Sequence, residues 1–132
     1  MADRKIVLAV DDSSIELAIY KNILGKDYDL RICKSAVEAF KLLDTCKPDI
    51  ILLDIEMPDM SGFEFLHQIK KTPALIRTPV LIVSSHDTPE FVSHATSQGA
   101  SGLLPKPVDP AVLLEKIRYY LEHPQKGGIF DL

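Results

Sequence analysis

The strongest constraint on the fold of this chain is the regular alternation of short apolar runs with amphipathic segments. Three runs, at residues 6–10, 50–53 and 80–83, are continuously apolar and rich in β-branched residues, which is typical of strands buried on both faces. Two weaker strands are expected at 28–33 and 101–104. The small residues at 99–102 allow close packing at the entry to the last strand.

Segments with helical periodicity separate these strands. Gly25 is expected to end the first helix, Ser35 to cap the second, and Asp109 to cap the fifth, with Pro110 at its first position. A polar fourth helix is expected at 89–98. The apolar faces are predicted to consist of Ile15, Ala18, Ile19 and Ile23 in the first helix, Ala36, Ala39, Phe40 and Leu43 in the second, Phe65, Leu66 and Ile69 in the third, and Leu113, Leu114, Ile117, Tyr120 and Leu121 in the fifth.

Five strand–helix units with short connections predict right-handed crossovers and a parallel sheet with helices on both faces. The expected fold class is α/β, a doubly wound five-stranded parallel sheet with five helices in three α/β/α layers. With 132 residues, 46% of them hydrophobic, the chain can form one domain with one core. We expect that domain at 1–122, followed by a tail or the start of a linker at 123–132.

Composition argues against several classes of function. A net charge of −4 disfavours direct binding of nucleic acid, which needs a basic surface. No apolar run is long enough to cross a bilayer, and the first residues lack the layout of a signal peptide. Cys33 and Cys46 have no metal-binding spacing and are expected to be reduced. A cytoplasmic protein without a membrane partner is therefore expected.

Polar residues follow the ends of the predicted strands. In a parallel sheet these ends share one edge, where ligands bind. Carboxylates gathered there would raise one another's pKa values unless a cation that prefers oxygen ligands, such as Mg²⁺, were bound. A lysine nearby would suit an incoming phosphoryl oxygen. The residues at this edge are Asp11 and Asp12 after the first strand, Asp54 at the end of the third, Ser84 and Ser85 at the end of the fourth, and Lys106 with Pro107 after the fifth.

This arrangement suits phosphoryl transfer, which depends on positioning and on neutralisation of charge. Asp54, at the end of the most apolar strand, is the candidate nucleophile and would form an aspartyl phosphate. Each residue alone has an ordinary explanation: Asp12 or Ser13 could cap the first helix, and Asp54 could be a loop acid. Solvated or capping roles are expected for the four histidines, His67, His86, His94 and His123.

The motifs, taken in order, resemble the receiver domain of two-component response regulators, most closely the single-domain chemotaxis type, over residues 5–122. Residues 54–62 resemble the loop after the acceptor aspartate of that family, and Val10-Asp11-Asp12 resembles its acidic pair. Lys106-Pro107 and the small residues at 99–102 match its last strand and the loop that follows. The resemblance implies a flavodoxin-like fold.

The resemblance also implies a site. Asp54 would accept a phosphoryl group from a histidine kinase, a phosphotransfer protein or a small phosphodonor, in a reaction that needs Mg²⁺ or its substitute Mn²⁺. Self-dephosphorylation would follow, without turnover of an independent substrate. The metal ligands would be Asp11, Asp12, Asp54 and the backbone carbonyl of Glu56.

Other residues would contact the phosphoryl group or shape its surroundings. Lys106 and Ser84 would contact the phosphoryl oxygens. Pro58 and Gly62 would shape the loop after Asp54, Pro58 by fixing φ and Gly62 through a positive φ. The Lys106–Pro107 peptide bond would be cis.

Two positions depart from the usual pattern of the family. Ser84 stands where threonine is commoner, and it lacks the methyl group that stiffens the rotamer. Leu103 replaces the aromatic residue that moves on phosphorylation. We expect the acceptor chemistry to be intact. We expect the surface of the fourth helix, fifth strand and fifth helix to rearrange on phosphorylation in a different way from that of relatives with the aromatic residue.

The expected partners are a downstream effector protein or a C-terminal output domain, and the expected state is a monomer or a weak dimer linked to phosphorylation.

Two alternatives remain open from the sequence. One is a degenerate receiver that serves only as a protein-interaction module, which the complete acid set and Lys106 disfavour. The other is a phosphohydrolase with an aspartate nucleophile, in which Glu56, two residues after Asp54, would be the general acid. The position of Asp54 on the third strand and the lack of a substrate-capping insertion disfavour that enzyme.

Overall fold

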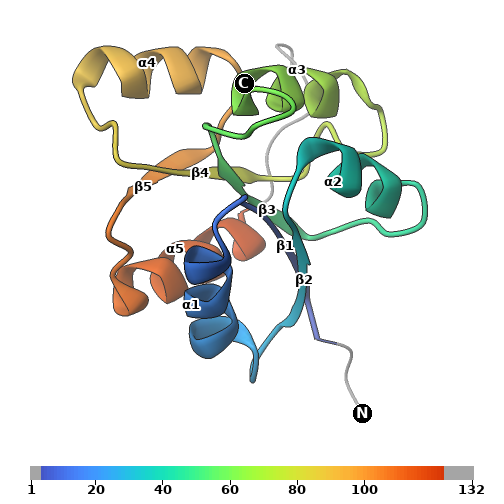
Figure 1. The fold of residues 1–132 in the computed structure, drawn as a ribbon, viewed down its shortest axis with the longest axis vertical. Coiled ribbons are helices and arrows are strands. Elements are labelled where there is room, and N and C mark those ends of the chain that lie inside the picture. The colour runs from blue at the N-terminus through green and yellow to red at the C-terminus, as the bar shows by residue number, and fades with distance from the viewer. Residues whose placement is uncertain (1–3, 124–132) are drawn as a thin grey trace.

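Strands and helices alternate along the whole of the described chain, residues 4–123 of a computed structural model. The elements are β1 Ile6–Val10, α1 Ser14–Leu24, β2 Asp29–Cys33, α2 Ala36–Leu43, β3 Ile50–Asp54, α3 Gly62–Lys71, β4 Val80–Ser84, α4 Pro89–Ser97, β5 Gly102–Pro105 and α5 Pro110–Glu122. The five strands are parallel and form one sheet in the order β2-β1-β3-β4-β5. Helices α1 and α5 cover one face of the sheet, and α2, α3 and α4 cover the other (Figure 1). This confirms the predicted three-layer, flavodoxin-like α/β fold.

The apolar core lies on both faces of the central strands. Every residue of β3 and β4 is buried, as the continuous apolar runs predict. The core on the α2–α3–α4 face includes the buried ring of Phe65, and the core on the α1–α5 face includes the buried ring of Tyr20. Full burial of one large apolar side chain stabilises a fold by about 1.5–3 kcal/mol, so these two layers supply most of the driving force that holds the strand ends in place.

The buried face of α1 differs from the predicted one. Leu17, Tyr20 and Leu24 face the sheet, whereas Ile15 is 75% exposed and Ile19 is 37% exposed. Ala18 is also exposed, and only Ile23 of the predicted set packs against the core. The prediction was wrong because α1 carries apolar residues on more than one face. Tyr20 adds a large ring to the face it shares with Leu17 and Leu24, and burial of that face removes more apolar area from water.

The helix ends follow the predicted capping residues. Ser35 and Asp109 cap α2 and α5 by accepting backbone hydrogen bonds, Pro110 is the first residue of α5, and Gly25 caps the end of α1. At α1 the cap is Ser13 rather than Asp12, since the Ser13 hydroxyl accepts from the Glu16 N–H. Asp12 is therefore left exposed at the edge of the sheet.

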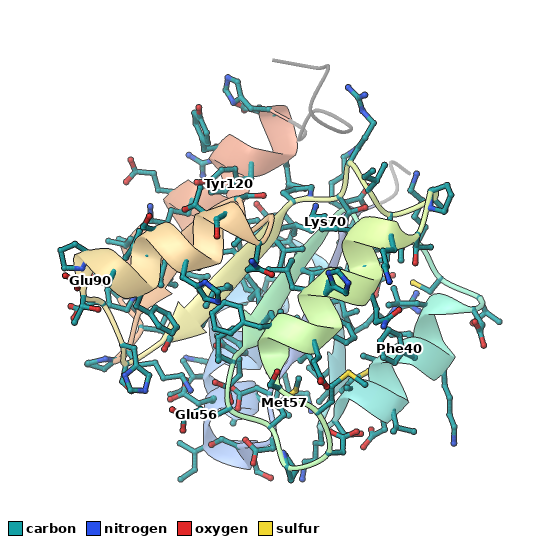
Figure 2. All side chains as sticks on the ribbon, turned by 90° about the horizontal axis from the view of Figure 1, so that it is seen from above. Phe40, Glu56, Met57, Lys70, Glu90 and Tyr120 are labelled. Carbon is teal, nitrogen blue, oxygen red and sulfur yellow. The ribbon has the colours of Figure 1, made fainter. Side chains whose placement is uncertain are left out.

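Close packing at β5 explains the small residues that precede and begin this strand. A Cβ on Gly102 would lie 2.5 Å from the Tyr120 hydroxyl oxygen, which donates a hydrogen bond to the Ser101 carbonyl at 2.9 Å. Tyr120 lies at the end of the molecule opposite Glu56 (Figure 2). Gly102 therefore allows α5 to approach β5 closely, far from the edge where Asp54 lies.

A partly buried lysine, Lys70, holds the loop between α3 and β4 by hydrogen bonds. The Lys70 ammonium donates hydrogen bonds to the carbonyls of Ile76 and Thr78, at 3.2 and 2.9 Å (Figure 2). Burial lowers the pKa of Lys70 to about 8. The charge is tolerated there because carbonyl oxygens replace lost water.

The strand order places a ligand site between β1 and β3. The chain leaves β1 toward β2 on one side and returns to β3 on the other, so the crevice between the two strand ends is the topological switch point. Among residues 4–123, no helix is long and apolar enough to cross a bilayer. The predicted domain limit at residue 122 stays a prediction, and most of the predicted tail, 124–132, lies outside the described residues.

Candidate functional site

Three carboxylates meet at the switch point. Asp11 and Asp12 follow β1, Asp54 is the last residue of β3, and one carboxylate oxygen from each lies within 4.8 Å of the others. Asp11 and Asp54 are buried, whereas Asp12 is exposed. The residues that follow β1, β3, β4 and β5 line a cleft of about 260 Å³ around the three acids. The predicted clustering of acids from separate strands is therefore present.

Local backbone contacts fix the orientation of Asp11. Its Oδ1 accepts a hydrogen bond from the Ser13 N–H at 2.9 Å, and its own N–H donates to the Cys33 carbonyl at 3.0 Å. Its Oδ2 is buried and has no hydrogen-bond partner among the described residues. The nearest cationic group, the Lys106 ammonium, lies 3.6 Å away, beyond hydrogen-bond distance, so this buried oxygen is suited to a closer cation.

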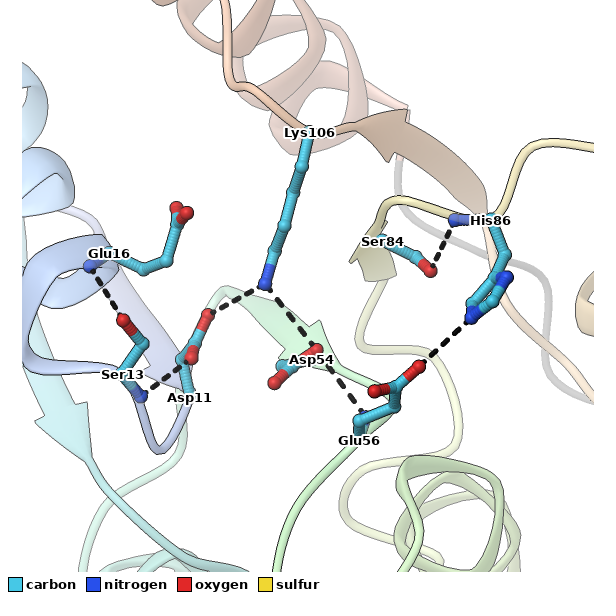
Figure 3. Close-up of polar contacts among 8 residues, drawn as sticks. All are labelled: Asp11, Ser13, Glu16, Asp54, Glu56, Ser84, His86 and Lys106. Carbon is cyan, nitrogen blue, oxygen red and sulfur yellow. Dashed lines mark hydrogen bonds and ion pairs between the residues drawn. The ribbon is translucent and has the colours of Figure 1, made fainter.

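Lys106 reaches into the same cleft from the loop after β5. Its Nζ lies 3.6 Å from Asp11 Oδ2 and 3.6 Å from Asp54 Oδ1 (Figure 3). The backbone N–H of Lys106 donates to the Ser84 carbonyl at 3.0 Å, which ties its loop to the end of β4. The Lys106–Pro107 peptide bond is cis, the geometry that the family resemblance implies.

Burial is the main cause of the shifted pKa values in the site. It raises the pKa of Asp54 to about 6, and the Asp11 carboxylate adds to the increase while Lys106 opposes it. Burial also raises the pKa of Asp11, against the Ser13 N–H and Lys106, which lower it. Repulsion between the acids, which the sequence suggested as the cause, is therefore second to their removal from water.

The pKa of Lys106 is raised. Burial alone would lower it, but the carboxylates of Asp11, Asp54 and Glu16 outweigh that effect. Lys106 is therefore a fully charged ammonium at neutral pH and can face an anionic group without loss of its proton.

Ser84 and Leu103 lie on neighbouring strands. Ser84 is 4% exposed, and its hydroxyl oxygen accepts a hydrogen bond from the His86 N–H at 3.0 Å. The hydroxyl hydrogen remains available to a group in the cleft. Leu103 pairs with Ile82 and packs, half-buried, against the core of the α2–α3–α4 face.

His86 is a site residue that the sequence did not predict. Its Nε2 lies 2.9 Å from Oε1 of Glu56, so this pair bridges the loops after β3 and β4 at the mouth of the cleft (Figure 3). The His86 ring also packs against Phe91 of α4, with ring centroids 5.5 Å apart. A solvated or capping role was expected for His86, and the contact could not be foreseen because 30 residues separate it from Glu56.

The loop after Asp54 is held at both ends. Asp59 accepts hydrogen bonds from the N–H groups of Ala36 and Val37, which lowers the pKa of Asp59 and joins the loop to the start of α2. The predicted positive φ of Gly62 is wrong, since Gly99 alone among the described glycines has one. Gly62 is needed for close approach instead: a Cβ there would lie 2.6 Å from Ile55 Cα. Pro58 lies in the exposed bend between these contacts.

The donor set fits a hard divalent cation. Three carboxylates supply oxygen ligands, one of their buried oxygens has no hydrogen-bond partner among residues 4–123, and no sulfur or imidazole ligand lies in the cluster. Such a set selects Mg²⁺, Mn²⁺ or Ca²⁺ over softer metals.

Known proteins are related to this chain in sequence and in structure. The response regulator receiver domain family matches residues 7–118. The chain is 38% identical over 111 residues to the two-component response regulator ORR6 of Oryza sativa subsp. japonica, covering 80% of this chain and 64% of that protein. It is 37% identical over 114 residues to a protein-glutamate methylesterase/protein-glutamine glutaminase of Pyrococcus abyssi (strain GE5 / Orsay), covering 81% of this chain and 30% of that protein.

A solved structure shows the same fold over nearly its whole length. The chemotaxis response regulator CheY4 of Vibrio cholerae aligns with a TM-score of 0.83 and 30% identity, covering 88% of this chain and 98% of that one. The chain spans less than two thirds of both curated relatives named above, so it corresponds to one part of each. With its family, fold and acid cluster in agreement, this chain belongs to the response regulator receiver domain family.

Proposed function

We propose that Asp54 is the phosphoacceptor of this receiver domain. The observation that carries the proposal is the position of its carboxylate, buried at the end of β3 between the acids that follow β1 and the Lys106 ammonium. A buried strand end holds the nucleophile rigidly, and phosphoryl transfer depends mainly on positioning and charge neutralisation.

In the proposed reaction, a carboxylate oxygen of Asp54 forms a bond to phosphorus. The bond from phosphorus to the donor breaks at the same centre, and the electron pair of that bond leaves with the donor. The donor is the phosphohistidine of a kinase or a phosphotransfer protein, or a small acyl phosphate. Water later attacks the phosphorus of the aspartyl phosphate, which returns the carboxylate and releases inorganic phosphate.

Asp11, Asp12, Asp54 and the Glu56 backbone carbonyl would hold Mg²⁺, with Mn²⁺ as its substitute. When bound, the cation would neutralise charge on the carboxylates and the transferring group. Lys106 would contact a phosphoryl oxygen through its ammonium, which lies 3.6 Å from Asp54 Oδ1. Ser84 would donate its hydroxyl to another oxygen. These roles follow from the family resemblance and are supported by the shared cleft.

The added charge of about −1.5 to −2 would then bias the surface of α4, β5 and α5 between two states. Ser84 would draw the β4–α4 loop toward the phosphoryl group. Leu103 has no ring to swing inward, so the change would travel through the loop before α4, where His86 contacts Phe91. An effector protein or a C-terminal output domain would respond to this surface, in a cytoplasmic pathway.

Incubation with Mg²⁺ and acetyl phosphate tests the proposal directly. Intact mass spectrometry should detect one added phosphoryl group on wild type and none on Asp54→Asn. Turnover of many equivalents of a small phosphorylated metabolite would favour the phosphohydrolase instead. Absence of labelling, together with absence of Mg²⁺ binding, would favour the degenerate interaction module.

A further inference from the structure

Three helices of this domain begin with the same local arrangement. The hydroxyls of Ser13, Ser35 and Ser61 each accept a hydrogen bond from the N–H of the glutamate three residues later, at 3.2–3.3 Å. In a capping box the glutamate carboxylate also reaches back to the N–H of the capping residue. The three glutamates are Glu16, Glu38 and Glu64.

At α1 the N–H that a return contact from Glu16 would use is already bonded to another residue. The Ser13 N–H donates to Asp11 Oδ1 at 2.9 Å, so it is engaged by a residue of the acid cluster. Glu16 Oε2 is buried and lacks a hydrogen-bond partner in the part of the chain that the structure describes. Such an atom carries an energetic cost and calls for an explanation.

The nearest explanation is Lys106. Figure 3 shows the Glu16 carboxylate turned to the same side of the cleft as the Lys106 stem, on the other side of that stem from Asp54. Glu16 is one of three carboxylates that raise the pKa of Lys106, after Asp11 and Asp54, although burial lowers it. The lysine stem is flexible, and its ammonium has two acidic partners at 3.6 Å that a bound cation would also need.

We propose that Glu16 is a positioning residue that receives the Lys106 ammonium when a divalent cation enters between Asp11, Asp12 and Asp54. A cation and an ammonium repel each other at such short range, so entry of one is easier when the other has a second carboxylate to face. Glu16 thereby favours cation binding without being a ligand. This inference rests on the proposed Mg²⁺ site.

A double-mutant cycle on Mg²⁺ affinity tests this role. The dissociation constant is measured by calorimetry for wild type, Glu16→Gln, Lys106→Met and the double variant. Glu16→Gln should weaken Mg²⁺ binding by about threefold or more, since the displaced ammonium loses its alternative partner. Lys106→Met should bind Mg²⁺ more tightly than wild type, and adding Glu16→Gln to it should change the affinity by less than about 1.5-fold.

Glu38→Gln is the matched control, because it alters the same capping position in α2 away from the cleft. Glu38→Gln should leave the Mg²⁺ dissociation constant unchanged. Its effect on stability to urea should equal the part of the Glu16→Gln effect that comes from helix capping. If Glu16→Gln weakened Mg²⁺ binding equally in wild type and in Lys106→Met, the inference would be overturned. That result would show that the Glu16 charge attracts the cation directly and does not act through Lys106. No weakening in either background would also overturn it. Absence of Mg²⁺ binding by wild type would instead refute the proposed function.

Discussion

Lys106 Nζ lies at the same distance, 3.6 Å, from Oδ1 of Asp54 and from Oδ2 of Asp11. One ammonium therefore faces two buried acids, with the exposed carboxylate of Asp12 beside them. When all are ionised, three negative charges and one positive charge leave a net charge of −2 in the cluster. That surplus makes the edge of the sheet receptive to a divalent cation, and it adds to the cost of ionising Asp54, which comes mainly from burial.

The first prediction concerns the stability of Asp54→Asn. The pKa of Asp54 is raised from 3.8 to about 6 in the folded state, mainly by burial, so the proton binds the native state more tightly than the unfolded one. The stabilisation by that proton is full below pH 3.8 and is lost as pH rises through about 6. The amide that replaces the carboxyl group in this variant does not titrate, so the variant should be more stable than wild type at pH 7.5 by about 1–3 kcal/mol in EDTA.

Urea unfolding between pH 4 and pH 8 measures this difference. The advantage of Asp54→Asn should shrink toward zero at the acidic end and should shrink again at pH 7.5 when Mg²⁺ is added. A constant advantage at every pH would show that ionisation of Asp54 is not its source.

The second prediction concerns Mg²⁺ and Asp12. Wild type at pH 7.5 should gain about 2.7 kcal/mol of stability when Mg²⁺ is a hundredfold above its dissociation constant, because the ion binds the folded acid cluster. Asp12 is exposed, so Asp12→Asn should fold normally and lose most of that gain. The measurement is urea unfolding with and without Mg²⁺ at fixed ionic strength. An undiminished gain in Asp12→Asn would place the ion elsewhere.

The strands and helices could be predicted because their sequence patterns are local, and the acid cluster could be predicted from the order of those elements. The continuous apolar runs indicated the strands, and the parallel topology then brought Asp11 and Asp54 to one edge. The buried face of α1 could not be predicted from periodicity, since apolar residues surround that helix and the choice of Leu17 over Ile15 depends on packing against α5 and the sheet.

The contacts of Glu16 and His86 also depend on tertiary structure. Glu16 has the sequence of an ordinary capping box, and the sequence does not show that Asp11 accepts from the Ser13 N–H or that one Glu16 carboxylate oxygen is buried. His86 meets Glu56 because the loops after β3 and β4 lie side by side at the carboxyl edge of the sheet. No local sequence pattern predicts either contact.

The third prediction concerns signal transmission by Ser84. Ser84→Ala should still be phosphorylated, because the nucleophile and the acid cluster are unchanged. It should show little change in the amide NMR spectrum of α4, β5 and α5 on phosphorylation, because the loop before α4 loses its hydroxyl contact. It also leaves the His86 N–H without its acceptor and should cost about 1 kcal/mol of stability. A full, wild-type spectral change in Ser84→Ala would contradict this role.

The fourth prediction concerns the contact between β5 and α5. Gly102→Ala should destabilise the domain by about 1–3 kcal/mol, because its Cβ would lie 2.5 Å from the Tyr120 hydroxyl oxygen, and moving that hydroxyl would break its hydrogen bond to the Ser101 carbonyl. Tyr120→Phe removes that oxygen, so the double variant should lose less than the sum of the two single losses. Thermal or urea unfolding of the four proteins gives the coupling. Strict additivity would show that Tyr120 is not the obstacle.

The most direct test of the central claim is to locate the phosphoryl group on the chain. After reaction with acetyl phosphate and Mg²⁺, borohydride reduces an aspartyl phosphate to homoserine, which peptide mass spectrometry can assign to one residue. The account predicts homoserine at position 54 alone, formed only when Mg²⁺ is present. Homoserine at another aspartate, or equal labelling of position 54 in EDTA, would contradict it.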